Sequence, residues 1–172
     1  GIRLQGAAAG VDHIDIGDSI VDATRTAGIV APRAQLTLNR CTVIAAAIST
    51  LCVDVEKLNA SNTLIAGRAD VTDLQNGCFR FSARGPLSRV PQPYESHVVD
   101  ELARLFNSRR FGDPAYLTLQ PHAPAALHAG SEDGSEIGAY CGEIGPVKLA
   151  SLRSKVEEYM PFGRLPAFLL EN

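Results

Sequence analysis

The first acidic residues of this sequence recur at every third position, a spacing that can gather carboxylates on one surface. They are Asp12, Asp15 and Asp18, and His13 lies beside them. Carboxylate oxygens are the ligands that a hard cation such as Ca²⁺ prefers, and a pair of acids also carries out glycoside hydrolysis. The positions 22 residues later carry no acid. We therefore favour a solvated outer face, and keep a carbohydrate-active site at these acids as the alternative.

A second acidic group lies in the glycine-rich stretch "GSEDGSEIG", at residues 130–138. Its order of residues differs from that of an EF-hand loop, which excludes that type of calcium site. Long loops at a surface often carry binding functions. We predict a flexible loop that binds a partner through Glu132, Asp133 and Glu136, with Asp113 as a further binding residue. Asp113 precedes a proline in "FGDPAY" and is also typical of a turn.

Other motifs that carry chemistry do not occur in the sequence. There is no Gly-x-Ser-x-Gly nucleophile elbow, and "GAAAG" lacks the lysine and hydroxyl residue of a phosphate-binding loop. The four cysteines have no Cys-x-x-Cys spacing, so we predict small buried side chains and no zinc site. We therefore predict no catalytic residue, no metal and no cofactor. The cysteines are Cys41, Cys52, Cys78 and Cys141.

The composition limits the kind of partner. The 172 residues are 45% hydrophobic and 20% charged, with a formal net charge of −3, which is ordinary for a soluble globular protein. The sequence lacks a basic footprint for nucleic acid, and no apolar run reaches the ~20 residues that span a bilayer. The first residues lack the pattern of a signal peptide and are strand-like from Ile2. We expect a segment of a longer chain and leave its location open.

A repeat of 22 residues predicts the strands that position the first acidic group. The stretches "HIDIGDSIV" (13–21), "QLTLNRCTV" (35–43) and "KLNASNTLI" (57–65) align without gaps. Apolar or small residues alternate with polar ones, as in strands with one buried face. The apolar or small columns are Ile14, Leu36 and Leu58; Ile16, Leu38 and Ala60; Ser19, Cys41 and Thr63; and Val21, Val43 and Ile65.

The alternation shifts by one residue within each stretch, at 17–18, 39–40 and 61–62. Gly, Asn and Ser tolerate the bent backbone of a corner. Strands joined by corners, with one coil every 22 residues, are typical of a right-handed parallel β-helix, in which stacked coils bury continuous columns. A leucine-rich repeat has a similar period, but these stretches lack its second leucine-rich half. We predict a mainly β fold with three clear coils.

A looser match at the same period predicts a third face of the coils. We also expect Phe79 and Phe81 of "GCFRFSA" (77–83) to cover the last coil, because large aromatic side chains can close an apolar end. The columns of the third face are Val30, Cys52 and Leu74, and Ala27, Ser49 and Val71.

The second half of the sequence predicts a different organisation. Prolines and a glycine indicate a linker at residues 86–93, between β-helix coils at 1–85 and an α+β cap at 94–172. Apolar stripes predict helices over 94–110 and 145–163, and alternation predicts a strand over 114–120. Because solenoids need their ends covered, we expect this segment to cap one end of the coils.

Several blocks resemble those of a group of uncharacterised bacterial proteins: "LTLNRCTV", "NGCFRFS", "FGDPAYLTL", "GSEDGSEIGAY" and "VEEYMPFG". In that group, a short β-helical repeat precedes a Gly-Asp-Pro-x-Tyr segment and an acidic Ser-Glu-rich loop. The resemblance runs from about residue 11 to the end, and it implies an architecture without catalytic residues. The coil period is also distantly similar to that of pectate-lyase-like β-helices.

These observations favour a non-catalytic structural or binding module of a larger bacterial protein or assembly, which presents its coil faces and the acidic loop to a partner. The partner is predicted to be a protein or the rest of a longer chain, and neither nucleic acid nor a membrane. A homo-oligomer formed through the strand edge at Ile2–Leu4 is a further hypothesis. The alternative is a carbohydrate-active lyase or hydrolase that uses the outward acids, because this fold serves several functions.

Overall fold

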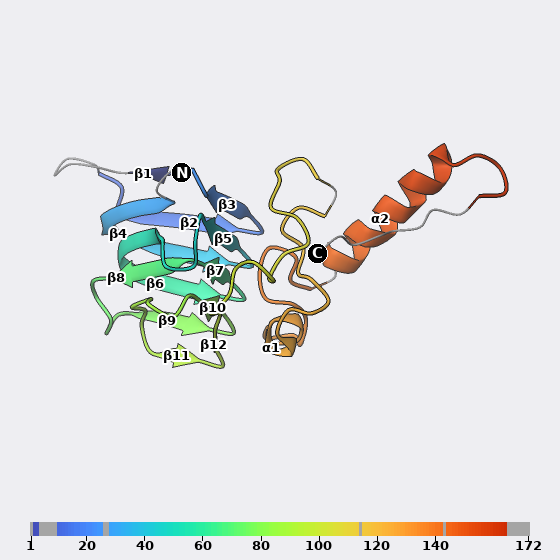
Figure 1. Ribbon diagram of the computed structural model, residues 1–172. Coiled ribbons are helices and arrows are strands. Elements are labelled where there is room, and N and C mark those ends of the chain that lie inside the picture. The colour runs from blue at the N-terminus through green and yellow to red at the C-terminus, as the bar shows by residue number, and fades with distance from the viewer. Residues whose placement is uncertain (1, 4–9, 26–27, 114, 143, 165–172) are drawn as a thin grey trace.

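The structure is a computed structural model, and it describes residues 2–3, 10–25, 28–113, 115–142 and 144–164. Within them the chain forms a parallel β-solenoid of about three turns, followed by a segment with two helices. The predicted mainly β, coiled fold is therefore confirmed. Figure 1 shows the coils stacked from β1 to β12, with the C-terminal segment beside them.

Two parallel sheets form the walls of the solenoid. In the first sheet the strand order is β1-β4-β6-β9-β11, with β2 also paired to β4 and β8 to β6. In the second sheet the order is β12-β10-β7-β5-β3. The strands of the first sheet are β1 (Ile2–Arg3), β2 (His13–Gly17), β4 (Ile29–Asn39), β6 (Leu51–Ser61), β8 (Arg68–Val71), β9 (Gly77–Arg80) and β11 (Pro93–Tyr94). Those of the second are β3 (Ile20–Ala23), β5 (Thr42–Ala45), β7 (Leu64–Ala66), β10 (Ala83–Arg84) and β12 (His97–Val98).

The predicted columns stack in register. Leu36 pairs with Ile14 on one side and with Leu58 on the other, and Val43 lies between Val21 and Ile65 in the second sheet. The side chains of Leu36 and Leu58 are fully buried. Burial of apolar area on this scale is the main stabilising contribution that stacked coils gain, because a single coil cannot cover its own apolar face.

The predicted corners are also present, and they share one backbone conformation. The φ angles of Asp18, Arg40 and Asn62 are 47°, 51° and 52°, in the left-handed region. Two further coils continue the pattern at Phe81 (47°) and Glu95 (45°). Asn and Asp tolerate this conformation better than most other residues, which explains why a short polar residue suits these positions.

The predicted third face is wrong in its spacing. Val30 pairs with Asp54 instead of Cys52, because the register of β4 shifts between Ala31 and Gln35. The next step is shorter, since Val53 pairs with Ala69. Leu74 is 38% exposed and so lies outside the core, whereas predicted Ala27 lies outside the described residues. A bulge of this kind adds residues to one coil without disturbing the neighbouring columns.

Parallel pairing continues past the predicted linker. Phe79 is buried between Ala60 and Pro93, and Ala83 pairs with His97, so "GCFRFSA" is followed by another partial coil and does not end the solenoid. The helix predicted over 94–110 is wrong, since this stretch holds β11, β12 and turns. The division of the chain into domains at residues 85 and 94 stays a prediction.

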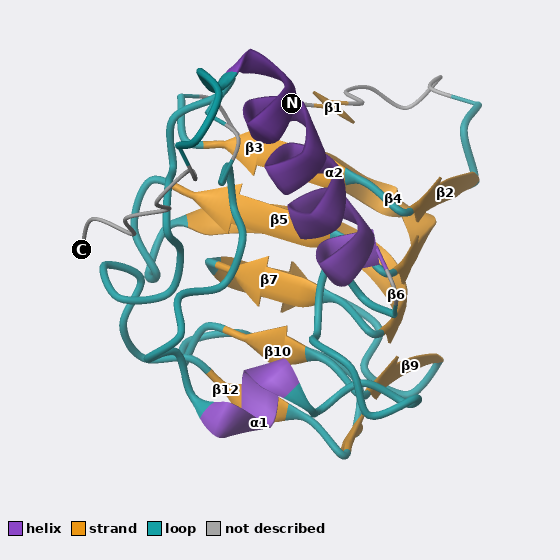
Figure 2. Ribbon diagram, turned by 90° about the vertical axis from the view of Figure 1, so that its right-hand side faces the viewer, coloured by secondary structure: helices purple, strands orange, loops and turns teal. Residues whose placement is uncertain are grey.

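The C-terminal segment covers the outer face of the second sheet, and not an end of the coils as expected. Leu105, Leu117 and Leu127 pack with Ile44 and Leu64 in a second apolar core. All four residues of β5 and all three of β7 are therefore buried on both faces. The predicted strand over 114–120 is reduced to isolated bridges. Figure 2 looks onto this face, with loops and helices in front of the stacked strands.

Two helices complete the segment. The first, α1 (Ala125–His128), is one turn long and buries Leu127. The second, α2 (Ile144–Tyr159), agrees with the helix predicted over 145–163. It projects away from the sheets in Figure 1, and Tyr159 at its end is exposed. No helix in the described ranges is long and apolar enough to cross a membrane.

Candidate binding cleft

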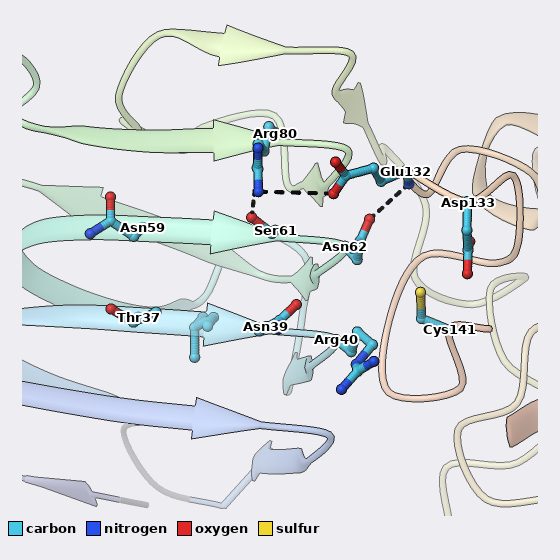
Figure 3. Close-up of a pocket in the computed structure, with 11 residues that line it drawn as sticks. Thr37, Asn39, Arg40, Asn59, Ser61, Asn62, Arg80, Glu132, Asp133 and Cys141 are labelled. Carbon is cyan, nitrogen blue, oxygen red and sulfur yellow. Dashed lines mark hydrogen bonds and ion pairs between the residues drawn. The ribbon is translucent and has the colours of Figure 1, made fainter.

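A cleft of about 460 Å³ opens where the first sheet meets the acidic loop. Its floor comes from the outer face of β4, β6 and β9, and its wall comes from residues 132, 133 and 141 (Figure 3). The residues that line it are Thr37, Leu38, Asn39, Arg40, Asn59, Ser61, Asn62, Arg80, Glu132, Asp133 and Cys141.

The floor of the cleft is a grid of polar side chains. Because side chains alternate along a strand, burial of Leu36 and Leu38 places Thr37 and Asn39 on the outer face. Thr37 is in register with Asn59, and Asn39 with Ser61 and then Arg80 on the following strands. Neighbouring strands lie about 4.8 Å apart, so these groups form rows across the coils. Amide and hydroxyl groups in such rows both donate and accept hydrogen bonds.

The wall of the cleft is anchored on the coil corners. The backbone N–H of Glu132 donates to Oδ1 of Asn62 at 2.9 Å, and that of Gly138 donates to the Asn62 carbonyl at 3.0 Å. The N–H of Ala139 donates to Oγ1 of Thr42 at 2.9 Å. The stretch predicted to be a flexible loop is thus held at several backbone groups, and Asn62 serves both as a corner and as an anchor.

The charges of the cleft are balanced. Arg80 donates from Nε to Oγ of Ser61 at 3.0 Å, and its Nη2 lies 3.9 Å from Oε2 of Glu132. Arg40 is held away from the loop acids by Asp18, with Nε 2.6 Å from Oδ1 and Nη2 2.9 Å from Oδ2. Two arginines and two acids among the lining residues leave the lining without net charge. The cleft therefore favours neither an anion nor a cation.

Hydrogen bonds around Asp133 hold the acidic loop in shape. The hydroxyl of Ser131 donates to Oδ1 of Asp133, and the backbone N–H of Ser135 donates to the same oxygen at 3.0 Å. These hydrogen bonds, with that from the Ser131 side chain the strongest, lower the pKa of Asp133 from its ordinary value of 3.8 to about 2. The ionised carboxylate is thus part of the loop's structure.

The shape of the loop should depend on pH in a defined window. Because the pKa of Asp133 is depressed in the folded loop, its contribution is present above pH 3.8 and lost as the pH falls through about 2. We expect the amide resonances of residues 131–135 to stay unchanged down to about pH 4 and to shift between about pH 4 and pH 2. The Asp133→Asn variant should lack this transition. A midpoint near 3.8 in the native chain would contradict the hydrogen bonding described.

The structure places the other predicted site residues apart from the cleft. Asp113 accepts a hydrogen bond from Oγ of Ser108 at 2.5 Å, in a local turn. Glu136 is half-buried and is not among the lining residues. In the first coil, Oδ1 of Asp15 lies 3.0 Å from Nε2 of His13. Asp12 is exposed. In the described part of the chain, no group of three or more His, Cys, Asp or Glu side chains is placed to hold a metal ion.

Sequence reasoning found two cleft residues, Glu132 and Asp133, and missed the residues that face them. Arg80 was missed because its coil is three residues shorter than the repeat, so it did not align with Ser61. The outward column of Arg40 and Asn62 was visible as polar residues at a spacing of 22, which was the available signal. The predicted burial of cysteines holds for three of them, while Cys78 is exposed on the outer face.

These features define the class of the protein as a parallel β-solenoid whose C-terminal segment packs on one sheet and forms a polar cleft at the corners of the other. Comparisons of this chain with protein-family models, with curated proteins and with solved structures find no match.

Proposed function

We propose that the chain is a non-catalytic binding module that takes an extended polypeptide segment of a partner protein in the cleft. The observation that carries this proposal is the grid of polar groups on the cleft floor, faced by the anchored loop. The resemblance of the Gly-Asp-Pro-x-Tyr and Ser-Glu-rich blocks to bacterial proteins supports a module within a larger bacterial chain or assembly.

The chemistry of the lining favours a polypeptide. An extended peptide presents alternating N–H and C=O groups, which side chains such as Asn59 and Thr37 can both accept from and donate to. Arg80 and Glu132 lie at the rim of the floor, where they can pair with acidic or basic side chains of the segment. A lining with equal numbers of positive and negative groups fits a partner of mixed polarity better than a polyanion.

The same geometry disfavours the carbohydrate-active alternative. Paired acids for glycoside cleavage must face each other across a substrate. Instead, Asp15 and Asp18 contact the basic side chains of His13 and Arg40, and Asp133 accepts hydrogen bonds from its own loop. These acids are engaged in local structure, which supports a binding role for the module.

The test is a selection of peptide ligands from a random dodecapeptide library on the immobilised chain. Enriched peptides would be synthesised, and their dissociation constants measured by calorimetry. We expect Asn59→Ala and Arg80→Ala to weaken binding about tenfold each, since each removes hydrogen bonds worth about 1.4 kcal/mol. The control is Arg33→Ala, which removes an exposed arginine that does not line the cleft. Equal binding by all variants would contradict the proposal.

A further inference from the structure

The first coil ends in an unpaired strand edge. In the described residues β2 pairs with β4 and β3 pairs with β5, each on one side only. The N–H of Asp18 donates to the Asn39 carbonyl at 3.0 Å, and the Asp12 carbonyl accepts from the N–H of Gln35 at 2.9 Å. Even-numbered residues of β2 therefore direct their backbone groups to β4. Those of His13, Asp15 and Gly17 face the free edge, because these directions alternate along a parallel strand.

The apolar columns are also incomplete at this edge. Ile14, Ile16 and Val21 are only partly buried, whereas Leu36, Leu38 and Val43 in the next coil are buried almost completely. The difference lies in the number of neighbouring strands, since each residue of the second coil has one above and one below. One more strand with inward apolar side chains would complete the columns.

The charge of the first coil indicates which side chains such a strand would present outward. Residues 10–25 contain four aspartates and one arginine, a net charge of −3. The Asp15 side chain is 68% exposed. The second coil already gives the matching arrangement, because Arg40 lies beside Asp18 of the first coil. A strand on the other side of β2 would pair in the same way through basic side chains.

The opposite edge of the solenoid lacks these features. There β11 and β12 are two residues long each, and Pro93 has no N–H to donate. Short strands and proline are the usual protection of a sheet edge against further pairing. A second copy added end to end would meet this protected edge. A second copy added through the same edge would bring two acidic coils together.

We propose that the free edge of β2 and β3 binds an extended segment of a partner protein, with alternating apolar and basic residues, as an additional parallel strand. The apolar side chains of the segment cover Ile14, Ile16 and Val21. Its basic side chains lie beside Asp12 and Asp15. This edge is separate from the polar cleft, so the two sites can be tested independently.

The test uses a blocked peptide of alternating leucine and arginine, labelled for fluorescence anisotropy. Asp15→Pro removes a backbone donor at the free edge, where proline is tolerated. Asp15→Asn removes the charge and keeps the donor. We expect Asp15→Pro to weaken binding more than about tenfold, through loss of edge hydrogen bonds, and Asp15→Asn to weaken it about threefold. Arg80→Ala, in the cleft, should leave binding unchanged.

A second peptide separates strand pairing from attraction to an acidic surface. It has the same sequence with alternate backbone nitrogens methylated, which keeps the charges and removes the donors of one edge. We expect it to bind at least about tenfold more weakly. Equal affinity of both peptides, or equal affinity of the native chain and folded Asp15→Pro, would overturn the proposal. It would also be overturned if the native chain alone formed dimers that Asp15→Pro abolishes, since a second copy would then occupy the edge.

Discussion

Replacement of Leu58 by alanine should lower the free energy of unfolding by about 2–5 kcal/mol. Leu58 is fully buried in the column that it forms with Leu36, and it lies in the middle of the solenoid. Truncation removes the transfer free energy of the side chain and leaves a cavity, because neighbouring coils are fixed by backbone pairing and cannot close around it. Urea unfolding followed by circular dichroism measures the change.

The matched control for this prediction is Leu74→Ala. Leu74 belongs to the column that the 22-residue spacing predicted, yet its side chain is 38% exposed and lies outside the core. We expect a change within about 0.5 kcal/mol, as for most surface positions. A similar loss for both variants would show that Leu58 has no special position in the core.

Replacement of Gly138 by alanine should release the acidic loop from the coil corners. Gly138 has a φ of 126°, which side chains rarely adopt, and an added Cβ would lie 2.6 Å from Oγ1 of Thr42. That hydroxyl accepts the N–H of Ala139, so the clash falls on an anchor of the loop. Backbone strain of this type costs about 1–3 kcal/mol before the clash is added. We expect hydrogen exchange in residues 130–142 to become at least about tenfold faster.

Gly134→Ala is the control for the release of the loop. Gly134 also has a positive φ, of 78°, but a Cβ there would meet nothing within 4 Å. This variant carries backbone strain in the same loop without the contact to Thr42. If both variants increased hydrogen exchange equally, strain within the loop would account for the effect, and the close approach of Gly138 to the solenoid would not.

The sequence predicted the parts of the fold that depend on local alternation. Leu36 and Leu38 alternate with polar residues, and the same pattern returns at a constant spacing, so their columns followed directly. The third face did not follow, because a register shift after Ala31 breaks the spacing without leaving a mark in the polarity of the residues. The apolar residues Val99, Leu102 and Phe106 have helical spacing, but they pack on a sheet in an irregular chain. Tertiary contacts decided that case.

The candidate site was predicted in part for a similar reason. Glu132 and Asp133 stood out as acids in a glycine-rich loop, and they do line the cleft. The contact of this loop with Asn62 joins residues 70 positions apart, and no periodic pattern encodes it. The ion pair of Arg80 with Glu132 depends on the same long-range contact. Local patterns therefore identify the surface groups, while the docking of the loop determines which of them share a cleft.

The cleft and its proposed partner both require that the acidic loop lies on the coil corners. Nuclear Overhauser contacts measured by NMR on the native chain test this directly. We expect contacts from the amide proton of Ala139 to the side chain of Thr42, and from that of Glu132 to the side chain of Asn62. Intraloop contacts alone, with random-coil shifts for residues 130–142, would contradict the docking and remove the cleft.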